Sequence, residues 1–130
     1  MTFSRVYTNS PWEKEVGYCR ALKAGDHIYI TGTVSLDEKG SIFAPGEAYE
    51  QAKNCLKIIE STLLKFDVPC AKIVRTRMFV TDISQWKAFG RAHHEFFEQN
   101  PPTTSMLEVQ RLIDPDLLVE IEAEAYVGRL

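Results

Sequence analysis

The sequence predicts an α+β fold, in which two amphipathic helices cover one face of a β-sheet. Three observations support this prediction. The segment 119–127, VEIEAEAYV, alternates between apolar and polar residues, as a strand with one buried face does. Segments 46–66 and 85–98 repeat apolar residues at steps of three and four, which is typical of half-buried helices. The 130 residues have the length of a single domain, 1–130, around one core.

The first half of the chain is expected to form two strands and the longer helix. Segments 18–23 and 27–35 are rich in β-forming residues and flank a turn at 24–26, which predicts a hairpin. A second turn at 37–41 leads to the helix at 46–66. The apolar stripe of this helix comprises Tyr49, Ala52, Leu56, Ile59, Leu63 and Phe66.

The second half is expected to form a strand at 72–83, a helix at 85–98, and strands at 104–112 and 119–127. Strict alternation along 72–83 places two sets of residues on opposite faces. One set is Val74, Thr76, Met78 and Val80, and the other is Ile73, Arg75, Arg77 and Phe79. The apolar stripe of the second helix comprises Trp86, Phe89, His93, Phe96 and Phe97.

One sheet face remains without a covering helix, and it mixes charged with apolar side chains. Its expected residues are Glu120, Glu122, Glu124, Arg75, Arg77, Phe79, Leu118 and Tyr126. Because like charges along one strand repel, at least one arginine is expected to pair with a glutamate of this row. In an arbitrary protein, a solvated or salt-bridged strand face is the usual explanation of such a row. Here the apolar neighbours favour a subunit interface or a pocket.

The composition argues against several functional classes. The formal net charge of −3 lacks the basic surface that duplex DNA requires. No apolar run of about 18 residues predicts a membrane span, and the first residues show no secretion signal. Three cysteines without paired spacing argue against a disulfide framework or a zinc ribbon, and favour a reducing cytoplasm. Adjacent His93 and His94 point in different directions on a helix, so neither a metal nor another cofactor is expected.

Four segments carry a resemblance to a known family. They are AYEQAKNCLKIIESTL, IVRTRMFVTDISQW, HEFF and SMLEVQRLIDPDLLVEIEAEA. Together they resemble the RidA/YjgF family, also called the endoribonuclease L-PSP family, over about residues 16–127. The resemblance implies a chorismate-mutase-like sheet with two helices on one face. It also implies a homotrimer with a central barrel, in which small-molecule pockets lie between subunits.

The resemblance further implies an activity and a set of site residues. The family hydrolyses reactive enamines and imines, such as 2-aminoacrylate, to 2-keto acids and ammonia. Glu120 matches the pocket glutamate that would activate water. The other matching substrate-binding positions are Tyr18, Thr31, Gly32 and Met106.

The substrate-gripping arginine of the family is missing from the matching segment. It aligns with Thr104 in PPTTS, and a threonine cannot make the bidentate contact of a guanidinium with a carboxylate. The chain therefore resembles a branch of the family without this arginine, for which Arg77 and His93 are associated features. Arg77 could supply a displaced anion-binding charge or pair with Glu122, and the sequence favours neither. His93 could line the pocket, although a satisfied interior or interface histidine is the commoner outcome.

For the whole protein, the sequence predicts a homotrimer that binds or hydrolyses a small reactive metabolite of non-standard structure. Its expected partners are this metabolite and further copies of itself, with neither DNA nor a membrane. A non-catalytic ligand-binding trimer is the main alternative. The ribonuclease activity of the older family name is a further alternative, but the sequence offers no aromatic and basic platform for RNA.

Overall fold

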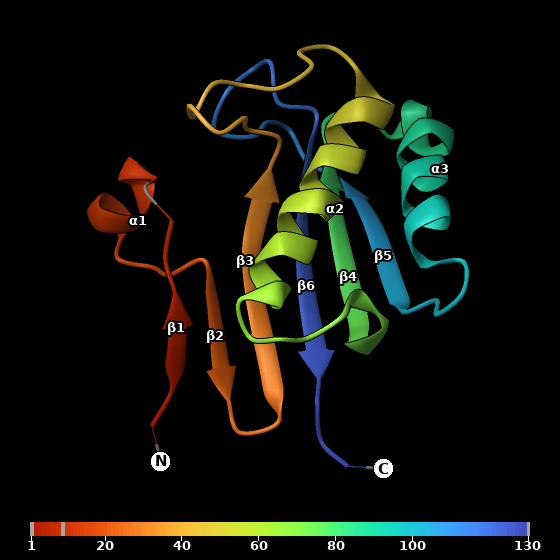
Figure 1. The fold of residues 1–130 in the computed structure, drawn as a ribbon. Coiled ribbons are helices and arrows are strands. Elements are labelled where there is room, and N and C mark those ends of the chain that lie inside the picture. Colours follow the sequence, from red (N-terminus) through yellow and green to blue (C-terminus); the bar gives the residue numbers. More distant parts are fainter. Residues whose placement is uncertain (1, 9, 130) are drawn as a thin grey trace.

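A six-stranded sheet forms the centre of the chain in the computed structural model, which describes residues 2–8 and 10–129 (Figure 1). The strands are β1 (Ser4–Val6), β2 (Ala21–Ala24), β3 (His27–Val34), β4 (Ile73–Val80), β5 (Thr103–Glu108) and β6 (Val119–Tyr126). Their order across the sheet is β1-β2-β3-β6-β4-β5. Neighbouring strands are antiparallel, except that β5 runs parallel to β4 after a helical crossover.

Two helices, α2 (Ala48–Leu64) and α3 (Trp86–Phe97), lie on the same face of this sheet (Figure 1). This arrangement confirms the predicted α+β fold. The buried stripe of α2 faces β3 and β6 and includes Ala52, Leu56, Ile59 and Leu63, each with 0% exposure. The buried stripe of α3 consists of Phe89, Ala92 and Phe97. Within the described residues, no helix is long and apolar enough to cross a membrane.

Gln51 is a buried polar residue on the inner side of α2. Its side-chain amide group donates hydrogen bonds to the carbonyl oxygens of Ala44 (3.1 Å) and Asp116 (2.8 Å). Its side-chain oxygen accepts a hydrogen bond from the backbone N–H of Leu118 at 2.9 Å. Because buried amides need partners, this network fixes the segment before β6 against the first turn of α2. It thereby fixes where β6 and its row of glutamates begin.

The N-terminal region contains two elements that the sequence did not predict. They are β1, which has three residues, and α1 (Pro11–Val16), which has six. Elements this short contain too few repeats for a period to emerge. The predicted strand at 18–23 begins later, at Ala21, so Tyr18 precedes β2. The predicted strand at 104–112 ends at Glu108, and the predicted helix at 46–66 occupies the shorter range of α2.

A β-bulge in β4 overturns part of the predicted alternation. Ile73 lies opposite Ala125 of β6, but Arg75 lies opposite Glu124, so Val74 is an extra residue in the ladder. Ile73 is consequently buried at 3% exposure, and Val74 is 47% exposed. The predicted placement of Ile73 with Arg75, and of Val74 with the core, was therefore wrong.

The predicted stripe of the second helix also needs one correction. Trp86 is 54% exposed, although it was assigned to the buried stripe of α3. It is the first residue of α3, and the Lys87 ammonium group lies 5.7 Å from the centre of its ring. A residue that opens a helix lies at the end of the apolar face, where less of the sheet lies beneath it.

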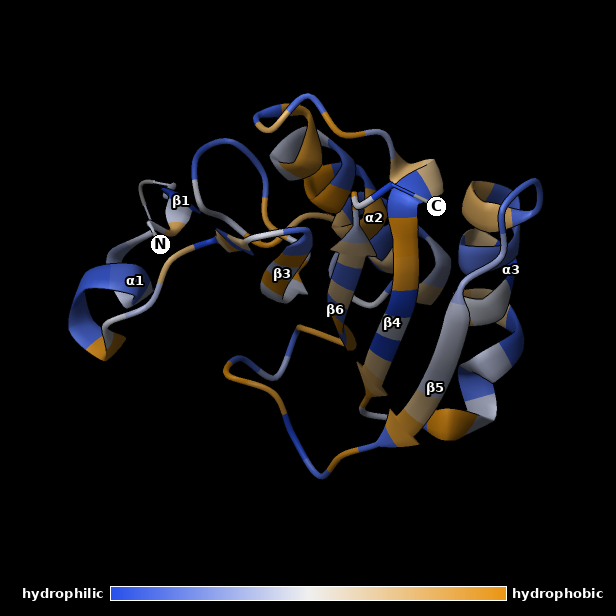
Figure 2. Ribbon diagram, turned by 90° about the horizontal axis from the view of Figure 1, so that it is seen from below, coloured by the Kyte–Doolittle hydropathy of each residue, from blue (hydrophilic) through white to orange (hydrophobic). Residues whose placement is uncertain are grey.

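The alternation of β6 is confirmed, with Val119, Ile121, Ala123 and Ala125 buried on the helix-covered side. Figure 2 shows the same mixture of hydrophobic and hydrophilic residues along the neighbouring strand β4. No helix of the described residues lies over the opposite face, which carries the glutamates. Tyr29 and Leu107 are 46% and 45% exposed, and Leu107 lies beside half-buried Phe79 in the ladder. This uncovered face therefore combines charges with exposed apolar surface.

Candidate functional site

A second β-bulge, at Thr31 and Gly32 of β3, forms the centre of the candidate site. Ile30 pairs with Ala123 and Thr33 pairs with Ile121, so two residues of β3 face one residue of β6. The backbone N–H of Thr31 donates to the carbonyl oxygen of Arg20 at 3.0 Å. The Thr31 hydroxyl donates to the carbonyl oxygen of Cys19 at 2.6 Å. The bulge is thus held against the segment that leads into β2.

The Glu120 side chain lies directly over Gly32. A Cβ atom at position 32 would lie 2.2 Å from Glu120 Oε2, so a larger residue would displace the carboxylate. Glu120 lies opposite Val34 on one side and Phe79 on the other, and neither carries a positive charge. Burial and the neighbouring Glu122 raise the pKa of Glu120, and Arg20 partly opposes this increase.

A cleft of about 920 Å³ lies beside the bulge, between the N-terminal segment and strands β2 and β3. Its lining includes Tyr7, Glu13, Tyr18, Cys19 and Thr31. Glu13, which is 5% exposed, accepts hydrogen bonds from the backbone N–H of Thr8 at 3.0 Å and from the Thr8 hydroxyl. These bonds fix one wall of the cleft. Tyr18 and Thr31 therefore line this cleft, and Gly32 and Glu120 contact each other at the bulge beside it.

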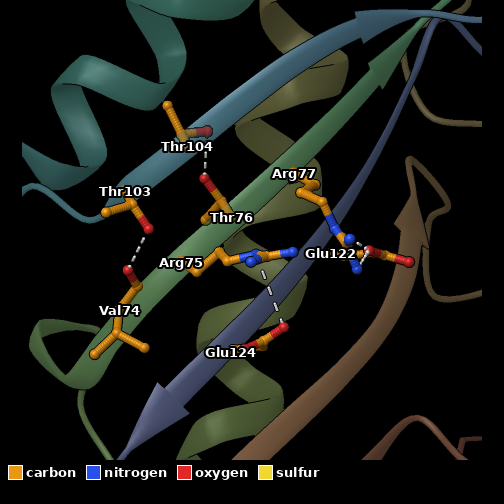
Figure 3. Close-up of polar contacts among 8 residues, drawn as sticks. All are labelled: Val74, Arg75, Thr76, Arg77, Thr103, Thr104, Glu122 and Glu124. Atoms are coloured by element: carbon orange, nitrogen blue, oxygen red, sulfur yellow. Dashed lines mark hydrogen bonds and ion pairs between the residues drawn. The ribbon is translucent and has the colours of Figure 1, made fainter.

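The predicted site positions Thr104, Met106 and His93 lie towards the opposite edge of the sheet, near the edge strand β5. The Thr76 hydroxyl lies 2.8 Å from His93 Nε2 and donates to the Thr104 hydroxyl at 2.7 Å. Figure 3 shows the contact between Thr76 and Thr104. Burial lowers the pKa of His93, and its ring packs against Phe97 at 4.5 Å between centres. His93 is thus half-buried and has a hydrogen-bond partner within the chain, and Met106 lies beside buried Met78 in the same ladder.

Thr76→Val tests the hydrogen-bonded chain from His93 to Thr104. Valine has the same shape as threonine but offers no hydroxyl, so His93 loses its partner inside the protein. The free energy of unfolding is expected to fall by about 1–3 kcal/mol, the typical cost of leaving a buried polar group without a partner. Denaturant titration measures this change. Thr76→Ser, which keeps the hydroxyl, is expected to lose less, and equal losses in both variants would argue against the chain.

Arg77 forms an ion pair with Glu122 on the uncovered face (Figure 3). Its Nη2 and Nε atoms lie 2.7 Å and 2.9 Å from Glu122 Oε1. Arg75 Nε lies 3.9 Å from Glu124 Oε1, which is a looser pair. The expected pairing of an arginine with a glutamate is thus confirmed. Arg77 was expected either to supply a displaced anion-binding charge or to pair with Glu122, and within the single chain it pairs with Glu122.

Apart from Arg77 on β4, the predicted site residues therefore form two groups that one chain does not bring together. Tyr18, Thr31, Gly32 and Glu120 lie around the β3 bulge, whereas Thr104, Met106 and His93 lie by β5. At about 4.8 Å per strand, Thr31 and Gly32 on β3 are three strand spacings, roughly 14 Å, from β5, and Glu120 on β6 is two spacings, roughly 10 Å, from it. Among the described residues, no three His, Cys, Asp or Glu side chains are arranged to hold a metal ion.

Sequence reasoning missed Arg20 and Cys19, which bond to the bulge, and Glu13, which lines the cleft beside it. Arg20 could have been noticed in the sequence, because it is a charged residue that lies between Cys19 and Ala21, and Ala21 is buried. Glu13 could not, because its partner Thr8 belongs to a loop and its helix is short.

Comparison with known proteins gives consistent matches over most of the chain. A family model described as Endoribonuclease L-PSP matches residues 8–127. The chain is 37% identical to the uncharacterized protein SCO2049 of Streptomyces coelicolor, over 95% of this chain and 92% of that protein. It is 27% identical to the 3-aminoacrylate deaminase RutC of Acinetobacter baylyi, over 85% and 86% of the two chains. The crystal structure of Rv2704 from Mycobacterium tuberculosis, a member of the YjgF/YER057c/UK114 family, is 39% identical. It has a TM-score of 0.87 and covers 97% of this chain and 100% of its own.

Proposed function

The chain belongs to the endoribonuclease L-PSP family, also called RidA/YjgF, and we propose that it binds and hydrolyses a small reactive imine or enamine. The observation that carries this proposal is the Glu120 carboxylate, which packs over Gly32 and has a pKa raised by burial and by Glu122. A carboxylate with a raised pKa is a stronger base than an ordinary one, which suits the activation of water. The name of the Acinetobacter relative, a 3-aminoacrylate deaminase, supports the same reaction class.

In the proposed reaction, Glu120 takes a proton from a water molecule whose oxygen attacks the carbon of the C=N bond. The double bond becomes a C–N single bond as Glu120 passes this proton to the nitrogen, which gives a carbinolamine. Glu120 then takes the proton of the new hydroxyl group and passes it to the nitrogen, so that the C–N bond breaks, ammonia departs and a carbonyl group forms. An imine and water thus yield a keto compound and ammonia, and Glu120 returns to its carboxylate form.

We further propose that three copies of the chain assemble so that each site contains residues of two copies. The exposed apolar residues of the uncovered face, such as Tyr29 and Leu107, support burial of this face in an assembly. A second copy that places its β5 edge beside the β3 bulge would bring Thr104 and Met106 to Glu120. This arrangement accounts for two groups of site residues that lie far apart within one chain.

Light scattering coupled to size exclusion tests the assembly. The expected mass is about 44 kDa, three times the 14.8 kDa of one chain. Leu107→Glu, which places a charge on the uncovered face, is expected to shift this mass towards the monomer. Leu64→Glu is the matched control, because Leu64 is 59% exposed at the end of α2, and it is expected to leave the trimer intact. A native monomer at micromolar concentration would contradict the proposed site.

The direct test of the activity is keto-acid release from imines of different side chains that are generated enzymatically in the assay. Turnover that depends on Glu120 supports the proposal. Binding of keto acids without turnover of any imine would instead favour a ligand-binding trimer without catalysis.

A further inference from the structure

Arg20 is a partly buried cation beside the β3 bulge, and its charge interacts with that of Glu120. Its backbone is fixed on both sides, because its N–H donates to the carbonyl oxygen of Val6 (2.7 Å) and its own carbonyl oxygen accepts from Thr31. Its Nη2 donates to the carbonyl oxygen of Gly32 at 2.8 Å. The guanidinium is therefore held at the residue over which the Glu120 carboxylate packs.

The hydrogen-bonding capacity of this guanidinium is largely unused. Its Nε atom is buried and has no hydrogen-bond partner, and Nη1 makes no hydrogen bond with any described residue. Arginine offers five N–H donors, so the bond to Gly32 leaves the two of Nη1 free for solvent or a ligand. Nε is the buried donor without a partner, whereas Nη1 is not among the buried unsatisfied atoms, so Nη1 is the nitrogen that a ligand can reach.

The positive charge of Arg20 also lacks an ion pair within the described part of the chain. No carboxylate oxygen there lies within 4.0 Å of its nitrogens. Burial lowers the pKa of Arg20, while Tyr18, Glu13 and Glu120 nearby oppose this effect. The guanidinium nevertheless stays protonated at any physiological pH. A buried charge is costly unless it is paired, so an anion beside Arg20 would be bound favourably.

We propose that Arg20 binds an anionic carboxylate group of the ligand beside Glu120, and that it does so mainly through Nη1. This proposal rests on the proposed function for the class of ligand. In a 2-imino acid the carboxylate is bonded directly to the imine carbon. A carboxylate held at Arg20 thus places the reacting carbon within one bond of the anchored group and close to Glu120. Because Nη2 is engaged and Nε is buried, the contact is a single charged hydrogen bond instead of a bidentate fork.

Pyruvate and its uncharged amide, pyruvamide, distinguish a charge-dependent site from a general cleft. They have nearly the same shape, but pyruvamide lacks the negative charge. In the native trimer, titration with pyruvate is expected to shift the NMR signal of the Arg20 Nε–H group and those of the Thr31 and Gly32 amides. Pyruvamide is expected to leave the Arg20 signal in place. Equal shifts with both compounds, or none with pyruvate, would overturn the proposal without any mutation.

Arg20→Gln removes the charge and keeps the aliphatic part of the side chain together with a shorter amide donor. Pyruvate is expected to bind about 10- to 100-fold more weakly, the loss of one charged hydrogen bond, and pyruvamide is expected to bind as before. Arg20→Lys, which keeps the charge, is expected to recover part of the binding. Arg91→Gln, on the exposed side of α3, removes one positive charge elsewhere and is expected to change neither affinity. A parallel loss for both compounds would show that Arg20 has a structural role alone.

The outcome for Arg20 is separable from the outcome for catalysis. If the native protein hydrolyses no imine but binds pyruvate in an Arg20-dependent way, the proposed activity is wrong and the anion site stands. If it hydrolyses imines and Arg20→Gln changes neither KM nor pyruvate affinity, the activity stands and the anion site is wrong.

Discussion

Glu120→Gln is expected to lower kcat/KM for keto-acid release by at least about 100-fold, the typical contribution of a positioned general base. Glutamine has nearly the same shape as glutamate, so it still fits over Gly32, where the structure leaves no room for a Cβ atom. It cannot take a proton from water. The affinity for pyruvate is expected to change much less than the rate, because Arg20 and not Glu120 binds the carboxylate in our proposal.

The same substitution is expected to raise the melting temperature at neutral pH. Burial and Glu122 raise the pKa of Glu120, so the folded chain holds its proton to a higher pH than the unfolded chain does. Ionisation of Glu120 therefore costs stability as the pH rises through the folded-state pKa, and this cost is absent below the unfolded pKa. Glutamine does not ionise. The difference in melting temperature between variant and native protein is thus expected to be largest at neutral pH and to vanish in acid.

Glu124→Gln is the matched control, since it changes the same group on the same strand and the same face. Glu124 lies near Arg75, and the two side chains are 38% and 46% exposed, so its loss is expected to affect stability slightly and activity little. Comparable turnover in Glu120→Gln and native protein would remove Glu120 from the mechanism. A lower melting temperature in Glu120→Gln at neutral pH would show that the carboxylate is stabilised by a partner in the assembly.

The two main helices and the last strand could be predicted from sequence because each buries one regular face. The α2 stripe repeats over 17 residues, and four of its members have no exposed surface. In β6 the alternation holds over the whole strand, since both of its neighbours pair with it along most of its length. In a long helix or strand with one buried side, the apolar residues repeat often enough for their spacing to be recognised in the sequence.

The bulges at Val74 and at Thr31-Gly32 could not be predicted, because a bulge is a property of two paired strands. The sequence IVRTRMFV alone does not require Val74 to be left out of the pairing with β6. The bulge arises when Arg75 and Arg77 pair with Glu124 and Glu122 on the neighbouring strand. In β3 the glycine was a usable signal, since a glycine within a strand often marks a bulge or a close contact, but its partner Glu120 lies 88 positions further along the chain.

The division of the site could not be predicted either, because it depends on the order of the strands. The resemblance gives Glu120 and Thr104 as members of one pocket, and their short separation in sequence suggests that they are close. The sheet places β4 between the strands that carry them. A pocket with both Glu120 and Thr104 requires a second copy of the chain. The sequence of one chain does not state directly how such copies are arranged.

Thr104→Arg is expected to raise kcat/KM for 2-iminobutyrate by about 10- to 100-fold over a low native value. In the native protein the substrate carboxylate has one charged hydrogen bond, from Arg20, and the Thr104 hydroxyl is neutral and already bonded to Thr76. A carboxylate accepts about four hydrogen bonds, so a second guanidinium can bind its remaining lone pairs in a bidentate fork. The gain is expected mainly in KM, since the carboxylate is bound equally in the ground state and the transition state.

Thr103→Arg is the matched control for this gain, because it adds the same charge one residue earlier on β5. Successive side chains of a strand point to opposite faces, and Thr103 lies opposite Arg75 on the uncovered side while Thr104 lies opposite Thr76 on the helix side. Thr103→Arg is expected to give no gain in kcat/KM, and because Thr103 shares the uncovered face with Leu107, the value falls if the added charge also weakens the trimer. Because the fork requires the β5 edge of a neighbouring copy, the gain in Thr104→Arg is expected to disappear when Leu107→Glu is added and the trimer dissociates. A gain that persists in the monomer would place Thr104 outside the shared site, and a native rate equal to that of Thr104→Arg would show that Arg20 alone provides a full anion anchor.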